Sequence, residues 1–176
     1  MKNRLSLALI FIPCLLSAQN EYYFFTESDI SQIRSAAKTE WGKGIIESLK
    51  DTVEARREYP LTVPLLEGGH IHDYFCPEHK VRFSFDWNKP EAHYCSQCKH
   101  YWTGNKRYDW AWVNVAHTHN YTYLRNCMYL YLATGNKVYA EYIRNMLLDY
   151  ASKYITYLDH DTARKVGPWG GKMFGQ

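Results

Sequence analysis

The 176-residue sequence has no apolar run long enough to cross a membrane. Its longest run, from Leu5 to Leu16, has 12 residues, whereas a transmembrane helix needs about 20. The sequence also has little excess charge, with 21 Lys and Arg side chains against 18 Asp and Glu. Because clustered positive charge is what binds a phosphate backbone, this balance argues against a nucleic-acid partner. We therefore expect neither a membrane span nor nucleic-acid binding.

Two catalytic patterns are also missing. The eight histidines include no H-E-x-x-H motif, which argues against a zinc protease. No base and orienting group surround any one of the five cysteines, so a catalytic thiol is not expected. What the chain does have is a hydrophobic content of 46% and an aromatic content of 16%, with 16 tyrosines and 6 tryptophans. This composition predicts a folded chain with a core.

Residues 1–18 have the pattern of a secretory signal peptide: two cations, an apolar stretch and a small-residue cleavage site. Cleavage after Ala18 makes Gln19 the mature terminus and leaves a net charge of +1. A lipoprotein signal anchored at Cys14 is the alternative, but Pro13 occupies a position where such signals have a small residue. A buried N-terminal helix is disfavoured by the same proline. We expect a periplasmic or secreted protein.

Residues 19–60 are expected to form an N-terminal helical segment. Thr26 or Ser28 is the predicted N-cap, and Tyr59-Pro60 ends the helix near Arg57. Glycines at 42 and 44 are places where this helix can kink or split. Apolar residues recur at steps of three and four on one face: Ile30, Ile33, Ala37, Trp41, Ile45, Leu49 and Val53.

Residues 108–176 are expected to form a helical hairpin followed by a glycine-rich loop. The helices span about 108–133 and 138–156, and Gly135 between them suits a left-handed C-cap. Such a short connection makes the helices antiparallel neighbours. The loop at 167–176 is interpreted as a truncation inside a larger domain. The first helix keeps six residues on one face: Val113, His117, Asn120, Leu124, Cys127 and Tyr131. The second helix keeps another six together: Tyr139, Ile143, Met146, Leu147, Tyr150 and Tyr154.

Residues 61–107 form a cysteine- and histidine-rich insert. Cys76-Pro-Glu-His79 and Cys95-Ser-Gln-Cys98 each place two ligands on a tight turn, with 15 residues between the turns. Four such ligands match the tetrahedral preference of Zn²⁺ and leave no open position, so the site would be structural. Alternation of apolar and polar residues from Val81 to Trp87 predicts a small hairpin that has no independent core.

Two alternatives to this ligand set remain open. An exported protein meets an oxidising compartment, where Cys76 could form a disulfide with Cys95 or Cys98. Cys127 lies on the apolar helical face and is expected to be a buried small hydrophobe. Four further histidines are near enough in sequence to replace a ligand: His70, His72, His93 and His100.

Several motifs resemble the N-terminal part of the heparinase II/III-like polysaccharide lyases. The resemblance covers about residues 20–176 and is most specific from residue 68 onward. The motifs are Gly68-Gly-His-Ile-His-Asp-Tyr-Phe-Cys-Pro-Glu-His79, Phe85-Asp-Trp-Asn88, His93-Tyr-Cys-Ser-Gln-Cys98, Trp102-Thr-Gly104, Tyr108-Asp-Trp-Ala-Trp112, Leu132-Ala-Thr-Gly-Asn-Lys-Val-Tyr-Ala140 and Trp169-Gly-Gly-Lys172.

This resemblance implies a mainly α fold: the N-terminal part of an incomplete α/α toroid with a small zinc-ribbon-like β insert. It also implies an exported enzyme that cleaves a uronic-acid polysaccharide, heparin-, heparan- or alginate-like, by β-elimination. No position here matches the family's catalytic His and Tyr, so no catalytic residue is named. The alternatives are a non-catalytic glycan-binding module and a glycoside hydrolase built on the same kind of toroid.

The candidate substrate-binding residues for an acidic polysaccharide fall in two places. Trp169, Lys172 and Gln176 lie in the glycine-rich loop, and loops that follow rigid elements often carry binding residues. His117 and Asn120 share a helical face with apolar neighbours and would point into a cleft. The alternatives are an ordinary connection for the loop and buried, hydrogen-bonded side chains for the polar pair. Four further aromatics could stack on sugars or anchor packing: Trp102, Tyr108, Trp110 and Trp112.

Overall fold

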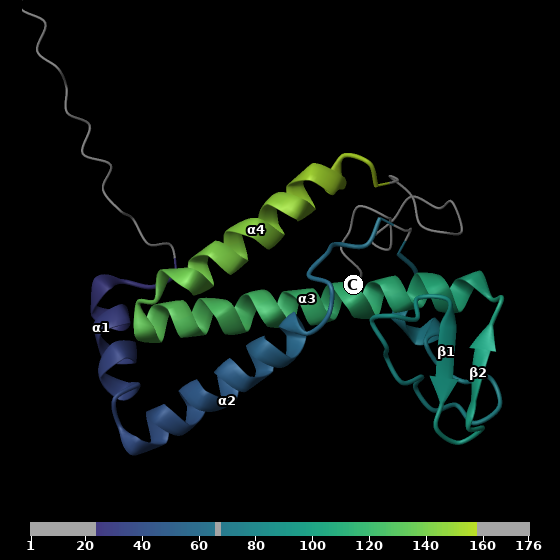
Figure 1. Ribbon diagram of the computed structural model, residues 1–176, viewed down its shortest axis with the longest axis horizontal. Helices are drawn as coiled ribbons and strands as arrows, with labels where there is room; N and C mark the ends of the chain where they lie inside the picture. The colour runs from purple at the N-terminus through teal and green to yellow at the C-terminus, as the bar shows by residue number, and fades with distance from the viewer. Residues whose placement is uncertain (1–23, 66–67, 158–176) are drawn as a thin grey trace, which may run out of the picture.

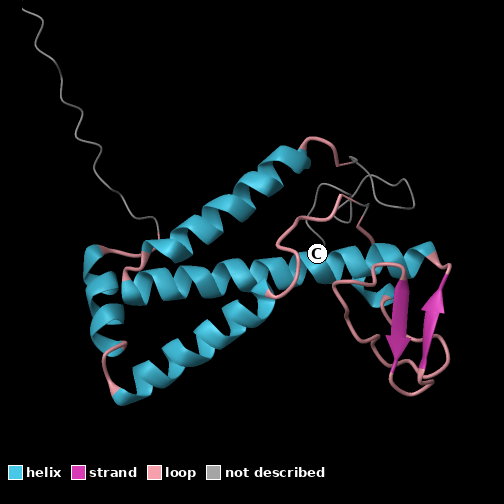
Figure 2. Cartoon of the chain, in the orientation of Figure 1, coloured by secondary structure: helices cyan, strands magenta, loops and turns pink. Residues whose placement is uncertain are grey.

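The computed structural model describes residues 24–65 and 68–157, and over these residues the protein is mainly helical (Figures 1 and 2). The predicted signal peptide and the glycine-rich loop at 167–176 lie outside them. In chain order the elements are α1 (Glu27–Ala36), α2 (Glu40–Arg57), the short 3₁₀ helix η1 (Ile71–Asp73), β1 (Ala92–Cys95), β2 (His100–Thr103), α3 (Lys106–Thr134) and α4 (Lys137–Tyr154). No helix among the described residues is long and apolar enough to cross a membrane.

The long helix α3 is the axis of the molecule. Figure 1 shows α1, α2 and α4 gathered around its C-terminal half, while the β hairpin lies beside its N-terminal end. Two hydrophobic clusters pack along α3. The helical core contains Val53, Val63, Tyr123, Cys127, Leu130, Tyr139, Met146 and Tyr157. The second cluster is shared by the insert and the N-terminal half of α3 and contains Tyr74, Cys76, Phe83, Cys95, Ala111, Trp112, Val113, Val115 and Ala116. Cys127 is fully buried, as its apolar helical face predicted.

The N-terminal segment forms two helices, α1 and α2, where periodicity predicted a single helix with glycines 42 and 44 as places to kink or split. Thr26 caps α1 through a capping box with Asp29, and Thr39 caps α2 by accepting a hydrogen bond from the backbone N–H of Gly42 at 3.0 Å. The turn places Gly42 directly against Ala36, where no side chain fits. Because the chain changes direction at this turn, the predicted apolar face is interrupted. Trp41 is 72% exposed and Ile45 is 41% exposed, so the predicted apolar face is wrong at these two residues.

The hairpin of α3 and α4 follows the sequence prediction closely. Gly135 adopts a left-handed conformation with φ of 70°, and its N–H donates to the carbonyl of Tyr131 at 2.8 Å. Asn136 then caps α4 through the backbone N–H of Val138. The helices run antiparallel and diverge from this turn (Figure 1). Three residues of the two predicted faces are exposed, Tyr131 at 37%, Leu147 at 51% and Tyr154 at 41%, so these faces are only partly buried.

The insert forms a smaller sheet than the alternation from Val81 to Trp87 predicted. That segment makes only isolated bridges, Phe75 with Arg82 and Ser84 with Tyr94. The two described strands are instead β1 and β2, paired antiparallel from Ala92–Thr103 to Cys95–His100. The insert has no core of its own, as expected, because Tyr74 and Phe83 pack against residues of α3.

The contact between Gly42 and Ala36 gives a test of the turn between α1 and α2. A Cβ at residue 42 would overlap the carbonyl oxygen of Ala36 and lie 2.8 Å from Cα of Ala37, both backbone atoms. We expect Gly42→Ala to lower the free energy of unfolding by about 1–3 kcal/mol. The matched control is Gly44→Ala in the same helix, where nothing lies within 4 Å. This control should raise stability by roughly 0.5–1 kcal/mol. Urea denaturation measures both, and equal stabilities would contradict the turn geometry.

Candidate functional site

Two turns of the same form carry the four predicted metal ligands. In the first, the backbone N–H of Lys80 donates to the carbonyl of Cys76 at 2.9 Å. In the second, Lys99 donates to Cys95 at 2.8 Å. Both lysines adopt the left-handed region, with φ of 55° and 59°. Each turn therefore reverses the chain immediately after its second ligand, so that both ligands of a turn face the same point.

The structure brings these four side chains together. Single ligand atoms from Cys76, His79, Cys95 and Cys98 all lie within 4.8 Å of one another. Sγ of Cys98 lies 3.5 Å from Sγ of Cys76 and 3.0 Å from Nδ1 of His79, and the other edge, Cys76 Sγ to His79 Nδ1, is 3.9 Å. In a tetrahedral site with metal–sulfur bonds of about 2.3 Å, neighbouring ligand atoms lie roughly 3.7 Å from one another. The cluster is therefore close to the size of a tetrahedral metal site.

The local hydrogen bonds favour thiolates at two of the three cysteines. Burial raises the pKa of Cys76, but backbone N–H groups of His79 and Glu78 outweigh it, so the pKa is lowered. The pKa of Cys95 is lowered in the same way by the N–H groups of Cys98 and Gln97, against the effect of burial. Burial and its neighbouring thiols raise the pKa of Cys98 to about 12. A bound cation would displace this proton, because cysteine binds metal as the thiolate.

The four cysteines of the described residues are free. The 3.5 Å between the sulfurs of Cys76 and Cys98 is well beyond the roughly 2.05 Å of a disulfide bond. Three sulfurs and one imidazole nitrogen are the donors that thiophilic divalent ions prefer. These donors fill all four positions of a tetrahedron and leave none for a substrate. The donor set therefore fits a structural ion better than a catalytic one.

Of the histidines near the cysteines, His79 is the one in the cluster. His93 is fully buried, and its Nε2 lies 2.8 Å from Oδ1 of Asp109. Its ring also packs edge-on against Tyr74 and Tyr108. The rings of His70 and His72 lie 4.7 Å apart, outside the cluster. His93 thus joins the hairpin to the first turn of α3 and does not replace a ligand.

His117 and Asn120 belong to a buried polar network between α2, α3 and α4. Asn120 is fully buried and accepts a hydrogen bond from the guanidinium of Arg56 at 2.8 Å. Its amide donates to the carbonyl of Thr62 at 3.3 Å, and Nδ1 of His117 lies 2.9 Å from the hydroxyl of Tyr150. Both predicted residues are buried and hydrogen-bonded. Sugar binding by them stays a prediction, and sequence spacing gave no signal for Arg56, which is 64 residues from Asn120.

The remaining predicted site residues have different outcomes. Trp169, Lys172 and Gln176 lie outside the described residues. Trp112 is 5% exposed, donates its indole N–H to the carbonyl of Asp86 at 3.0 Å and stacks on Phe85, so it is a packing anchor.

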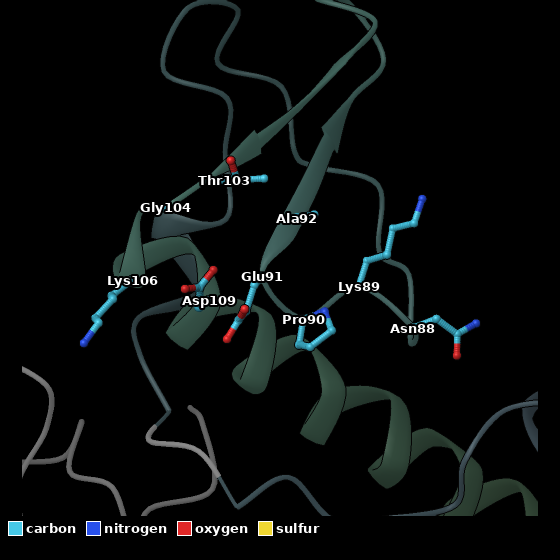
Figure 3. A pocket seen from close by; sticks show the side chains of 9 residues that line it. All are labelled: Asn88, Lys89, Pro90, Glu91, Ala92, Thr103, Gly104, Lys106 and Asp109. Carbon is cyan, nitrogen blue, oxygen red and sulfur yellow. The ribbon is translucent and has the colours of Figure 1, made fainter.

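A hollow of about 630 Å³ lies between the ends of the hairpin and the start of α3 (Figure 3). Lys89, Glu91, Lys106 and Asp109 line it among smaller residues, and Figure 3 shows these charged side chains pointing in different directions. The carboxylate of Asp109 is already engaged by His93. The hollow therefore has no convergent set of free catalytic groups.

A comparison of the chain with protein-family models, curated proteins and solved structures finds no match.

The cluster geometry predicts that a divalent metal binds and that Cys76, Cys95 and Cys98 each supply a ligand. We expect Co²⁺ added to the reduced protein to produce thiolate charge-transfer absorption at one equivalent. Cys98→Ser should weaken this binding by at least tenfold, because serine cannot supply a thiolate. Cys127→Ser is the matched control, since Cys127 is buried in the helical core away from the cluster. Equal Co²⁺ binding by both variants would rule out Cys98 as a ligand.

His117 predicts an acid sensitivity of folding. Burial lowers its pKa from 6.5 to about 4. Between these values the unfolded chain binds a proton that the folded chain does not, so stability falls as the pH falls from about 6.5 to 4. The gap between the pKa values corresponds to about 3 kcal/mol of unfolding free energy. His117→Gln should reduce the stability difference between about pH 7 and pH 4, measured by urea denaturation. The exposed His72→Gln should leave it unchanged, and an unchanged difference for both would contradict the prediction.

Proposed function

We propose that the protein is part of an exported polysaccharide lyase of the heparinase II/III type that contains a structural Zn²⁺ ion. The observation that carries this proposal is the convergence of Cys76, His79, Cys95 and Cys98. The motifs that resemble the family are most specific in this block. Two turns 15 residues apart meet at one point, as a metal-binding insert requires. Export agrees with the signal-peptide pattern of residues 1–18.

Zinc is the ion that the donor set suits best. It has no geometric preference from its d electrons and accepts a tetrahedral mixture of thiolate and imidazole ligands. Cys76 and Cys95 are fully buried within the core that joins the insert to α3. An ion bound here would tie the first turn to the β1–β2 hairpin and so hold both against Trp112. Its binding energy would contribute to the folding of the insert.

The helical part supports a toroid built from paired helices. The helices α3 and α4 form an antiparallel hairpin with a tight connection, and α2 also packs against α3 (Figure 1). The guanidinium of Arg57 on α2 lies 4.3 Å from the ring centre of Tyr142 on α4, so α2 and α4 cover neighbouring faces of α3. Successive antiparallel pairs of this kind are the repeating unit of an α/α toroid. The helix α4 has an exposed apolar face formed by Leu147, Leu148 and, directly after the helix, Ile155. A following helix pair would cover this face.

The proposed reaction is β-elimination in a uronic-acid polysaccharide. A base removes the weakly acidic proton at C5, beside the carboxylate, an acid protonates the departing O4, and a double bond forms between C4 and C5. Positioned donors must neutralise the carboxylate while this proton leaves. We assign no catalytic base or acid to the described residues. Lys172, Trp169 and Gln176 remain proposed contacts to the acidic substrate.

Two measurements on the protein from the complete natural gene test the proposal. Metal analysis of protein purified without added metal should find one zinc per chain. Incubation with heparin, heparan sulfate and alginate should produce the ultraviolet absorbance of unsaturated uronate ends on at least one polymer. If zinc is found but no unsaturated product forms, the proposed metal site is supported and the proposed lyase activity is rejected. Reducing-end formation without unsaturation would indicate a glycoside hydrolase instead.

A further inference from the structure

A groove of about 400 Å³ lies between the residues that follow α2 and the insert. Its volume is within the roughly 300–1,000 Å³ of small-molecule sites. Eight residues line it, and five of them are aromatic: Tyr59, Phe85, Trp87, Tyr94 and Tyr101. The other three are the small or polar Ser84, Asp86 and Asn88. No sequence pattern predicts this groove, because its aromatics come from four separate stretches of the chain: the residues just after α2, the segment before β1, and the strands β1 and β2.

Most of these rings are held in place by neighbours. The guanidinium of Arg56 lies 3.6 Å from the ring centre of Trp87, and Phe85 packs edge-on against the same indole at 4.8 Å. The rings of Tyr94 and Tyr101 lie 5.2 Å apart on the paired strands β1 and β2. A site whose rings are already ordered loses little side-chain entropy when a ligand binds.

Two of the rings nevertheless remain open to solvent. Tyr59 is 39% exposed and Tyr101 is 45% exposed. An aromatic ring with an open surface and polar groups beside it suits a ligand with both C–H faces and hydroxyl groups. Asp86 and Asn88 supply such polar groups within the same groove. This combination is characteristic of sugar recognition and is less suited to a purely apolar ligand.

The charges around the groove favour an anion. Arg56 is 9% exposed, and within the residues that the structure describes no carboxylate forms an ion pair with it. Burial lowers its pKa to about 10, so it stays charged at neutral pH. At the rim, Nζ of Lys89 lies 2.6 Å from the hydroxyl of Tyr101, 4.1 Å from the centre of its ring and 3.9 Å from the carboxylate of Asp86. Neither cation lines the groove itself: Arg56 lies against Trp87, and Lys89 is at the edge beside Tyr101.

We infer that this groove binds an acidic sugar residue of a polysaccharide. The rings of Tyr59 and Tyr101 contact the C–H face of the pyranose, and Asp86 and Asn88 bind its hydroxyl groups. The positive charges of Arg56 and Lys89 favour a uronate over a neutral sugar. This inference rests on the proposed function and adds a binding subsite on the insert, separate from any catalytic residue.

Isothermal titration of the purified protein tests the subsite with three probes: an alginate tetrasaccharide, a heparin-derived tetrasaccharide and neutral cellotetraose. At least one acidic probe should bind more tightly than cellotetraose. Tyr101→Ala should weaken binding of that probe by about tenfold, the loss expected for one stacking ring. Tyr59→Ala provides a second variant from a different segment. The control is Tyr129→Ala on α3, which is equally exposed at 43% but does not line the groove.

The charge contribution is tested separately. Lys89→Gln should weaken binding of the acidic probe several-fold and leave cellotetraose unchanged, whereas the exposed Lys137→Gln on α4 should affect neither. Acidic binding that is unchanged in the Tyr59, Tyr101 and Lys89 variants overturns the subsite even if the complete protein is a lyase. Absence of acidic binding also overturns it. The lyase itself is judged only by unsaturated product, so the two failures remain distinguishable.

Discussion

Burial against α3 is the constraint on which the rest of the structure depends. Seven consecutive residues of this helix, Ala111–His117, are buried. A helix that packs on one side buries only a stripe at steps of three and four, so an unbroken run means that neighbours enclose it on all sides. The insert covers one part of this surface through Tyr74 and Phe83, and the chain around Gly69 covers another by donating its N–H to the carbonyl of Trp110.

Different interactions hold the helices and the insert against α3. The helices contribute apolar faces and close their ends with side-chain caps such as Thr26, Thr39 and Asn136. The insert has a two-stranded sheet and isolated bridges, and its apolar side chains pack against α3 instead of against a second sheet or helix of its own. Two of its turns also converge on one point. Cys76 and Cys95 belong both to the ligand cluster and to the hydrophobic cluster that packs on α3. Metal binding would therefore strengthen the packing on α3.

Arg56 links the helical half to the insert. Its guanidinium donates to Asn120 on α3 and to the carbonyl of Pro60, while its flat face lies over Trp87 of the insert. A buried charge is tolerated here because its hydrogen bonds are largely satisfied and the indole ring accepts part of the positive charge. The same residue therefore orders the chain that follows α2 and orients a ring of the aromatic groove. The groove therefore depends on how the chain that follows α2 packs against the insert.

The sequence by itself determined the local features of this protein: a helix start at Thr26 or Ser28, the left-handed Gly135 between two helices, and the pairing of Cys76 with His79 and Cys95 with Cys98. Each depends on residues only a few positions apart, where backbone geometry and ligand spacing act directly. Only the tertiary structure decided features that join distant residues. It separated α1 from α2 by seating Gly42 against Ala36, and so left Trp41 in solvent. It also brought Arg56 to Asn120 and gathered the groove aromatics, because such contacts depend on the packing of whole elements, which no local spacing records.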